Sequence, residues 1–200
     1  MKPILFNSEM VRAVISGRKT QTRRIIKKQP HGVAWFLRAK EWLFPNVNPH
    51  TSAVCPFGEV GKRLWVRETW AHHKLAINSR TDDEGPFVYA ADTMAEQHRL
   101  GDKWKPSIHM PRCASRITLE VTGVRVERLQ DISEADALAE GVSKLQDASG
   151  TNKYTIKIGD LHINAPTAAE VFKLLWWHIY GDESWDVNPW VWIVEFKRVD

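Results

Sequence analysis

Apolar residues recur along this chain with two different periods, one typical of helices and one typical of strands. A helical period joins the apolar residues between Met10 and Ile15, directly after Ser8, a residue type that often caps helix N-termini. Gly17 follows at a position where helices commonly end in a left-handed residue. The pattern therefore predicts a short first helix that starts at Ser8 and ends at Gly17.

Strict alternation marks the strands. Between Ile117 and Val126 the apolar residues alternate, but the phase slips by one position beside Gly123, which predicts a β-bulge in a curved sheet. Shorter strands are expected after Gly61 and over Phe87–Asp92. The stretch WVWIVEFKRV predicts a final strand whose two faces carry Trp190, Trp192, Val194 and Phe196 on one side and Val191, Ile193, Glu195 and Lys197 on the other.

Two further helices interrupt the strands. Ser133 with Asp136 resembles a capping box, and this helix is expected to end at Gly141 with Glu140 in its last turn. A second capping pair begins at Thr167, and its helix runs towards Gly181. Between the two helices, alternation around Gly159-Asp160 predicts a hairpin.

The composition is that of an ordinary globular protein, with 43% apolar and 26% charged residues in 200. We expect one α+β domain over 1–200, without a membrane span or signal peptide, and a cytoplasmic monomer. Cys55 and Cys113 are expected to stay reduced, and no metal or other cofactor is predicted, since the adjacent His72 and His73 lack the spacing of metal ligands. Most of the ten tryptophans are assigned to the core, and a minority to base stacking.

Positive charge gathers near the N-terminus and changes this picture. Residues 1–28 hold eight Lys and Arg side chains against one acidic residue, although the whole chain has a net charge of only +4. Four of these cations lie in the stretch SGRKTQTRRII, Ser16–Ile26, which leaves the helical period and predicts a turn that leads into a strand. Such a field favours a phosphate-bearing or otherwise anionic partner.

Four stretches together resemble the ASCH domain, a small barrel related to the PUA fold of RNA-binding proteins: GRKTQTRR, GKRLWVRETW, SEADALAEGV and WVWIVEF. The resemblance implies a PUA-like β-barrel decorated by helices, with extra material at about 28–58 and 143–165. It also implies a nucleoside or single-stranded RNA as the partner. The stretch PSIHMPRCASRI resembles longer members from phages and prophages, in which Trp often stands where this chain has Cys113.

The resemblance also implies a catalytic set. In ASCH relatives that hydrolyse N(4)-acetylcytidine, a lysine, a threonine and a glutamate act together, and by position these are Lys19, Thr22 and Glu140 here. The chemistry is coherent, because a lysine desolvated among other cations can lose its proton and activate a threonine hydroxyl. Residues three apart in a strand point to opposite faces, so Lys19 and Thr22 can meet only if Lys19 precedes the strand.

The remaining candidates would surround that set. Arg18, Arg23 and Arg24 are expected to bind substrate and to stabilise the anion, and Glu68 to pair with one of these arginines. His109, Arg112 and Arg116 would form a second basic rim of the same cleft. The leading hypothesis is a metal-free amidohydrolase for N(4)-acylated cytosine or cytidine. An RNA-binding module and a ribonuclease that use the same cleft remain as alternatives.

Overall fold

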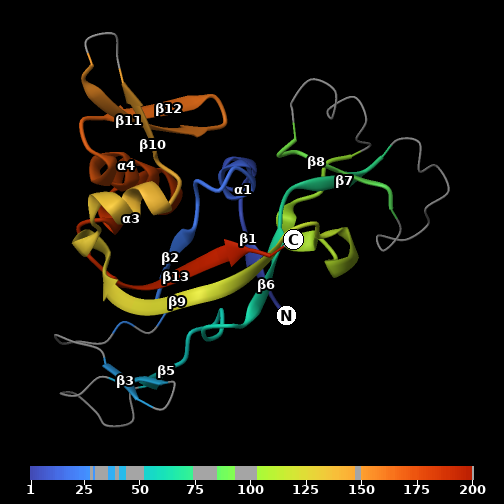
Figure 1. The fold of residues 1–200 in the computed structure, drawn as a ribbon, viewed down its shortest axis with the longest axis horizontal. Helices are drawn as coiled ribbons and strands as arrows, with labels where there is room; N and C mark the ends of the chain where they lie inside the picture. The colour runs from blue at the N-terminus through green and yellow to red at the C-terminus, as the bar shows by residue number, and fades with distance from the viewer. Residues whose placement is uncertain are drawn as a thin grey trace.

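The computed structural model describes residues 1–27, 29, 36–38, 41–43, 52–73, 85–92, 103–146 and 150–199, with side chains for all of these except 36–38, 41–43 and 52–53. It is an α+β structure (Figure 1). Its helices and strands are, in chain order, β1 (Lys2–Leu5), α1 (Ser8–Ile15), β2 (Gln21–Ile25), β3 (Phe36–Arg38), β4 (Glu41–Leu43), β5 (Ser52–Ala53), β6 (Arg63–Arg67), β7 (Trp70–His72), β8 (Phe87–Tyr89), η1 (Ser107–His109), η2 (Arg112–Ala114), β9 (Thr118–Arg128), η3 (Leu129–Asp131), α3 (Glu134–Ala139), β10 (Ser143–Gln146), β11 (Asn152–Ile158), β12 (Leu161–Ala165), α4 (Ala168–Tyr180), η4 (Asp182–Ser184) and β13 (Trp190–Arg198).

The main sheet has the strand order β1-β6-β9-β13-β2, and only the β1–β6 pair is parallel. The register between β9 and β13 shifts where Glu195 pairs with Gly123 and Phe196 with Val121, which leaves Thr122 as an extra residue. This is the predicted bulge, and β9 and β13 curve together through the centre of the molecule (Figure 1).

Two hydrophobic cores lie on opposite faces of β13, as its alternation predicted. Trp190, Trp192, Val194 and Phe196 join the core that contains β1, β6 and α1. Val191 and Ile193 join a second core that contains α3, α4 and residues of β11 and β12. One strand therefore serves both halves of the interior.

The expected closed barrel is not found in the part of the chain that the structure describes. β1 and β2 are the two edges of the main sheet, and they do not pair with each other. A side chain links these edges instead, since Arg24 Nη2 donates to the Leu5 carbonyl at 2.8 Å. The sheet is curved but open.

The helix boundaries follow local capping chemistry. The capping boxes at Ser133 and Thr167 are both present, and they start α3 and α4 as predicted. The first helix has the predicted length, but its N-cap is Asn7 and not Ser8, because the Asn7 side chain accepts the hydrogen bond from the Met10 N–H at 2.8 Å. None of the described helices is long and apolar enough to cross a membrane.

The two segments expected as extra material both contain strands. In the first, β3, β4 and β5 form a small antiparallel sheet, and the rest of this segment lies mostly outside the described residues. In the second, the predicted hairpin is β11 and β12 around Gly159, and β10 adds a third strand. We call this three-stranded sheet the inserted sheet; it packs against α4.

Candidate active site

Lys19 lies in the turn between α1 and β2, which is the position that the proposed chemistry requires. Gly17 has a φ of 74° and ends α1, as predicted. The Lys19 N–H then donates to the Ala13 carbonyl at 3.0 Å, and the Thr20 N–H donates to the Ala139 carbonyl at 2.9 Å. The turn is therefore fixed to both α1 and α3 before strand pairing begins.

Glu140 is the C-cap residue of α3, and the glycine after it allows a close approach to the same turn. Gly141 has a φ of 109°, a conformation that L side chains rarely adopt. A Cβ at this position would lie 3.3 Å from the Ala13 Cβ and 3.5 Å from the Lys19 Cβ. Gly141 thus lets the end of α3 pack directly on Lys19.

Lys19 and Glu140 form a buried ion pair. Lys19 Nζ lies 2.7 Å from Glu140 Oε2 and also donates to the Glu140 carbonyl at 2.8 Å. The two residues are only 2% and 4% exposed. Burial lowers the pKa of Lys19 below that of an exposed amine; the Glu140 carboxylate opposes this, and the charges of Arg24 and Arg23 add to it. The juxtaposition of this amine and this carboxylate, which the ASCH resemblance implies, is therefore present.

Thr22 and Glu140 line one hollow of about 260 Å³. The hollow lies between the β1–α1 junction and α4, with β2 between them. Its aromatic walls are Phe6, Phe172, Trp176 and Tyr180. Lys19 is not part of the wall; it lies behind Glu140, with Nζ 5.8 Å from the centre of the Phe6 ring. The hollow thus combines a hydroxyl, a carboxylate and aromatic surfaces suited to a planar ring.

The free edge of β2 faces this hollow. Hydrogen bonds from Phe196 N to Thr20 O and from Ile26 N to Trp190 O direct the even-numbered residues of β2 towards β13. The backbone N–H and C=O of Arg23 must therefore point to the opposite edge, where no described strand pairs with β2. Thr22, Arg23 and Arg24 all line the hollow, so a donor and an acceptor of the main chain are offered to a ligand there.

The guanidinium of Arg23 has a different role from the one predicted. Its Nη1 lies 3.5 Å from Glu140 Oε1, and its Nη2 lies 3.2 Å from Asp136 and 3.5 Å from Glu127. Three carboxylates therefore already neutralise this side chain, which is 3% exposed. Arg23 positions Glu140 from behind, and stabilisation of a substrate anion by its guanidinium is not supported.

Asp136 anchors this charge network. Burial raises the pKa of Asp136, whereas hydrogen bonds from the hydroxyl and N–H of Ser133 lower it. The charges of Arg23 and Arg125 lower it further, to about 2. Asp136 is therefore ionised at neutral pH. Its Oδ1 lies 2.6 Å from Arg125 Nη2.

Several buried polar atoms of the lining residues have no hydrogen-bond partner. They are Arg24 Nε, Trp176 Nε1, Glu140 Oε1 and the three guanidinium nitrogens of Arg23, two of which lie in ion-pair contact with carboxylates. Buried polar groups in folded proteins are rarely left unsatisfied, and such groups point to a ligand with complementary donors and acceptors. Arg24 is the predicted arginine that remains available as an anion donor, because its Nη2 contacts only the neutral Leu5 carbonyl.

The predicted second basic rim is not assembled at the hollow. Glu68 pairs with Arg116 through two hydrogen bonds of 2.9 and 3.0 Å, so its predicted pairing with the basic turn is wrong. Arg112 is exposed and its guanidinium lies 5.7 Å from the ring of Trp65, which is buried as predicted. His109 is exposed, and it is Ser107 of the same short helix that lines the hollow.

Sequence reasoning missed the aromatic wall and the backbone edge. Phe172 and Trp176 lie on the buried face of α4, and nothing in their spacing distinguishes a core contact from a ligand contact. Phe6 lies just before α1, outside the stretches whose apolar residues follow a helical or a strand period. The free edge of β2 follows only from the strand order, which the sequence does not contain.

A larger hollow of about 780 Å³ lies beside Cys55 and Phe57, and none of the predicted site residues lines it.

Among the described residues, no group of three or more His, Cys, Asp or Glu side chains is arranged to hold a metal ion. No protein-family model matches the chain, and neither does any curated protein or solved structure.

Proposed function

We propose that this protein is an amidohydrolase that removes the acyl group from N(4)-acylated cytosine or cytidine. The observation that supports this most strongly is that Thr22 and Glu140 line one small hollow, while the buried Lys19 forms an ion pair with Glu140. We further propose that the chain is an ASCH-type protein of the PUA-like class, in which the described sheet is open and its edges are linked through Arg24.

The proposed reaction begins with attack of the Thr22 hydroxyl on the acyl carbon. The proton of the hydroxyl passes to neutral Lys19, and the lowered pKa of this amine makes the neutral form accessible. The 2.7 Å hydrogen bond from Lys19 to Glu140 then carries a proton to the carboxylate that faces the hollow. Glu140 delivers this proton to the departing N4 amine, which leaves an acyl-threonine.

Water completes the cycle. It attacks the acyl-threonine and gives a proton to the same Lys19–Glu140 pair, which passes this proton to the departing Thr22 oxygen. The acetic acid formed ionises and leaves as acetate, with Thr22 and the ion pair restored. The N–H of Arg23 at the edge of β2 and the unpartnered Nε of Arg24 are suitable donors for the oxyanion in both steps. The aromatic wall holds the pyrimidine ring in the plane of these donors.

The direct test is turnover of N(4)-acetylcytidine by the purified full chain, followed by chromatography of the cytidine released. Thr22→Val removes the hydroxyl at nearly constant volume, and we expect turnover to fall by about 10³-fold or more. Thr22→Ser keeps a hydroxyl and serves as the matched control, with turnover largely retained. Equal activity of Thr22→Val and Thr22→Ser would exclude Thr22 as the nucleophile.

The alternative of an RNA-binding module predicts a different result. In that case the wild-type protein leaves N(4)-acetylcytidine intact but binds single-stranded RNA with an affinity that falls steeply with salt. Absence of turnover in the wild-type protein, together with such binding, would replace the amidohydrolase proposal. Cleavage of the RNA in the same assay would favour a ribonuclease.

A further inference from the structure

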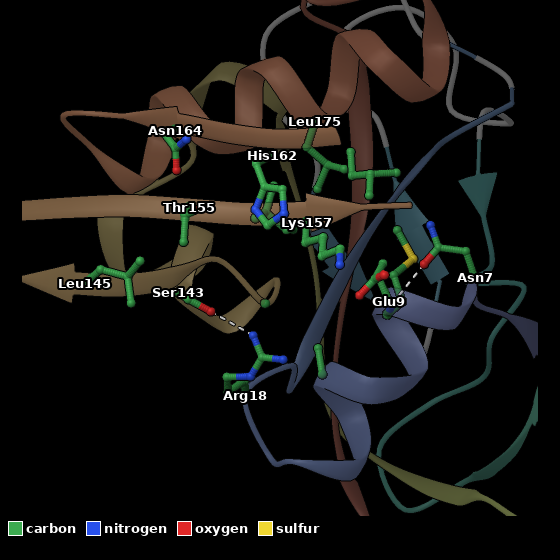
Figure 2. Close-up of a pocket in the computed structure, with 15 residues that line it drawn as sticks. Asn7, Glu9, Arg18, Ser143, Leu145, Thr155, Lys157, His162, Asn164 and Leu175 are labelled. Atoms are coloured by element: carbon green, nitrogen blue, oxygen red, sulfur yellow. Dashed lines mark hydrogen bonds between the residues drawn. The ribbon is translucent and has the colours of Figure 1, made fainter. Parts of the chain in front are cut away.

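A second hollow adjoins the candidate active site. It has a volume of about 300 Å³ and lies between α1 and the inserted sheet (Figure 2). Asn7, Met10 and Leu175 line both hollows, so the two are neighbours at the N-terminal end of α1. A ligand held at Thr22 therefore has room to extend in this direction.

The inserted sheet presents a polar face to the second hollow. The register pairs Lys157 with His162 and Thr155 with Asn164, and alternation places all four on the same face. The opposite face, with Tyr154 among its residues, packs into the core with α4. The sheet is thus amphipathic, and its polar side covers the hollow.

Two cations in this hollow have no carboxylate partner among the described residues. Arg18 Nη1 donates to the Ser143 hydroxyl at 2.7 Å and Arg18 Nε to the Ser16 hydroxyl at 3.0 Å, both neutral groups. Lys157 makes no ion pair with any described residue. Figure 2 shows Arg18, Lys157 and His162 directed into the same space.

One acidic residue, Glu9, also lines the hollow. Both of its carboxylate oxygens bind the guanidinium of Arg12, which offsets its charge. The hollow therefore keeps an excess of positive charge, supplied by Arg18 and Lys157. Hydroxyl and amide groups of Ser143, Thr155 and Asn164 surround these cations, and this is a suitable lining for a phosphate.

We propose that the second hollow binds a phosphate on the ribose of the acylated cytidine whose base occupies the first hollow. The preferred substrate is then a nucleotide and not a free nucleoside. This inference rests on the proposed function for the identity of the base. Two kinds of ligand carry such a phosphate, a mononucleotide and the backbone of an RNA.

The test compares the binding of cytidine 5′-monophosphate and cytidine by calorimetry, which requires no turnover. We expect the wild-type protein to bind the monophosphate about 10- to 100-fold more tightly, as charged hydrogen bonds of this kind allow. Lys157→Ala should remove most of this preference, and Lys157→Gln should behave in the same way. Lys144→Ala is the matched control, because Lys144 pairs with Tyr154 and lies on the other face of the same sheet.

Equal affinity for the two ligands in the wild-type protein, or a preference unchanged in both Lys157 variants, would overturn the inference even if N(4)-acetylcytidine is hydrolysed. Loss of hydrolysis with the preference intact would instead overturn only the proposed reaction. A third ligand, a short oligoribonucleotide that contains one N(4)-acetylcytidine, distinguishes a mononucleotide from RNA as the source of the phosphate. If the protein binds this oligonucleotide more tightly than the mononucleotide, the phosphate belongs to RNA. If the protein does not bind the oligonucleotide, the phosphate belongs to a mononucleotide.

Discussion

Two buried glutamates in this protein bind their cations in different ways. Glu68 is 1% exposed and accepts two hydrogen bonds from Arg116, whose remaining nitrogen donates to Asp92 at 2.9 Å. Glu140 is 4% exposed and accepts one hydrogen bond from Lys19, while its Oε1 has no hydrogen-bond partner. Glu140 lines a hollow, and Glu68 lines none of the hollows described above.

The difference shows which pair can do chemistry. Arginine keeps its proton at every accessible pH, so the Glu68–Arg116 pair is a fixed, fully bonded link. Burial raises the pKa of Glu68, and the hydrogen bonds and charge of Arg116 oppose this. Lysine can release its proton when it is buried, so the Lys19–Glu140 pair can exchange one with a ligand.

Exchange of the cation at Glu140 should have the largest effect. In Lys19→Arg the positive charge remains but the side chain no longer accepts a proton, so we expect turnover of N(4)-acetylcytidine to fall by about 10²- to 10⁴-fold. Circular dichroism should show a retained fold, because Glu140 keeps a partner. Wild-type turnover in this variant would mean that Lys19 is not the base.

Removal of the carboxylate should change the pH dependence. Glu140 raises the pKa of Lys19, so Glu140→Gln lowers that pKa further. Because the base must be neutral, the acid limb of kcat/KM should move to lower pH, while turnover falls by about 10²-fold. The measurement is a pH–rate profile of both proteins. If the acid limb lies at the same pH in both proteins, ionisation of Lys19 does not control the pH dependence of turnover.

At Glu68, replacing the bound arginine by lysine should lower the stability of the fold without changing turnover. Arg116→Lys breaks the two-fold hydrogen bonding to Glu68, and we expect the free energy of unfolding to fall by about 1.5–3 kcal/mol. Turnover below the melting temperature should be unchanged. Urea denaturation and the nucleoside assay together check this; a matching loss of turnover would place Arg116 in the reaction.

Gly141→Ala should strain the connection between α3 and the basic turn. An L residue at a φ of 109° is unfavourable, and its Cβ would press on Ala13. We expect a loss of about 1–3 kcal/mol in the free energy of unfolding, with reduced turnover as Glu140 shifts. Gly150→Ala is the comparison, since Gly150 also has a positive φ but no atom within 4 Å of its Cβ. Equal losses would show that backbone strain alone is responsible.

The smallest expected effect concerns Asp136, whose pKa in the folded protein is about 2. The pKa of an aspartate in an unfolded chain is about 4, so its ionised form stabilises the fold fully above that pH. This contribution is lost as the pH falls from about 4 to about 2. Asp136→Asn should therefore lose about 1 kcal/mol at neutral pH and show a shallower decline in acid. Urea midpoints at several pH values measure both effects.

Local patterns predicted much of this structure. The capping pairs at Ser133 and Thr167, the bulge beside Gly123 and the two faces of β13 depend on residues close together in sequence, and the structure contains all of them. The juxtaposition of Lys19 and Glu140 is different, because it came from the ASCH resemblance and not from periodicity.

Long-range partners were not predictable in the same way. Glu68 could have paired with any of several arginines, and only the folded chain selects Arg116. The open sheet and the free edge of β2 are likewise consequences of strand order. Lys157 and His162 face a hollow because the inserted sheet turns its polar side towards α1, and alternation alone does not specify which element a face meets.

The central position of β13 has a consequence for synthesis of the protein. β2 carries Thr22, and among the described strands it pairs only with β13, which is translated more than 160 residues later. Until the ribosome has released β13, neither hydrophobic core can close and the edge that offers Arg23 to a ligand has no support. The nascent chain should therefore acquire its interior and its binding site in a single late step.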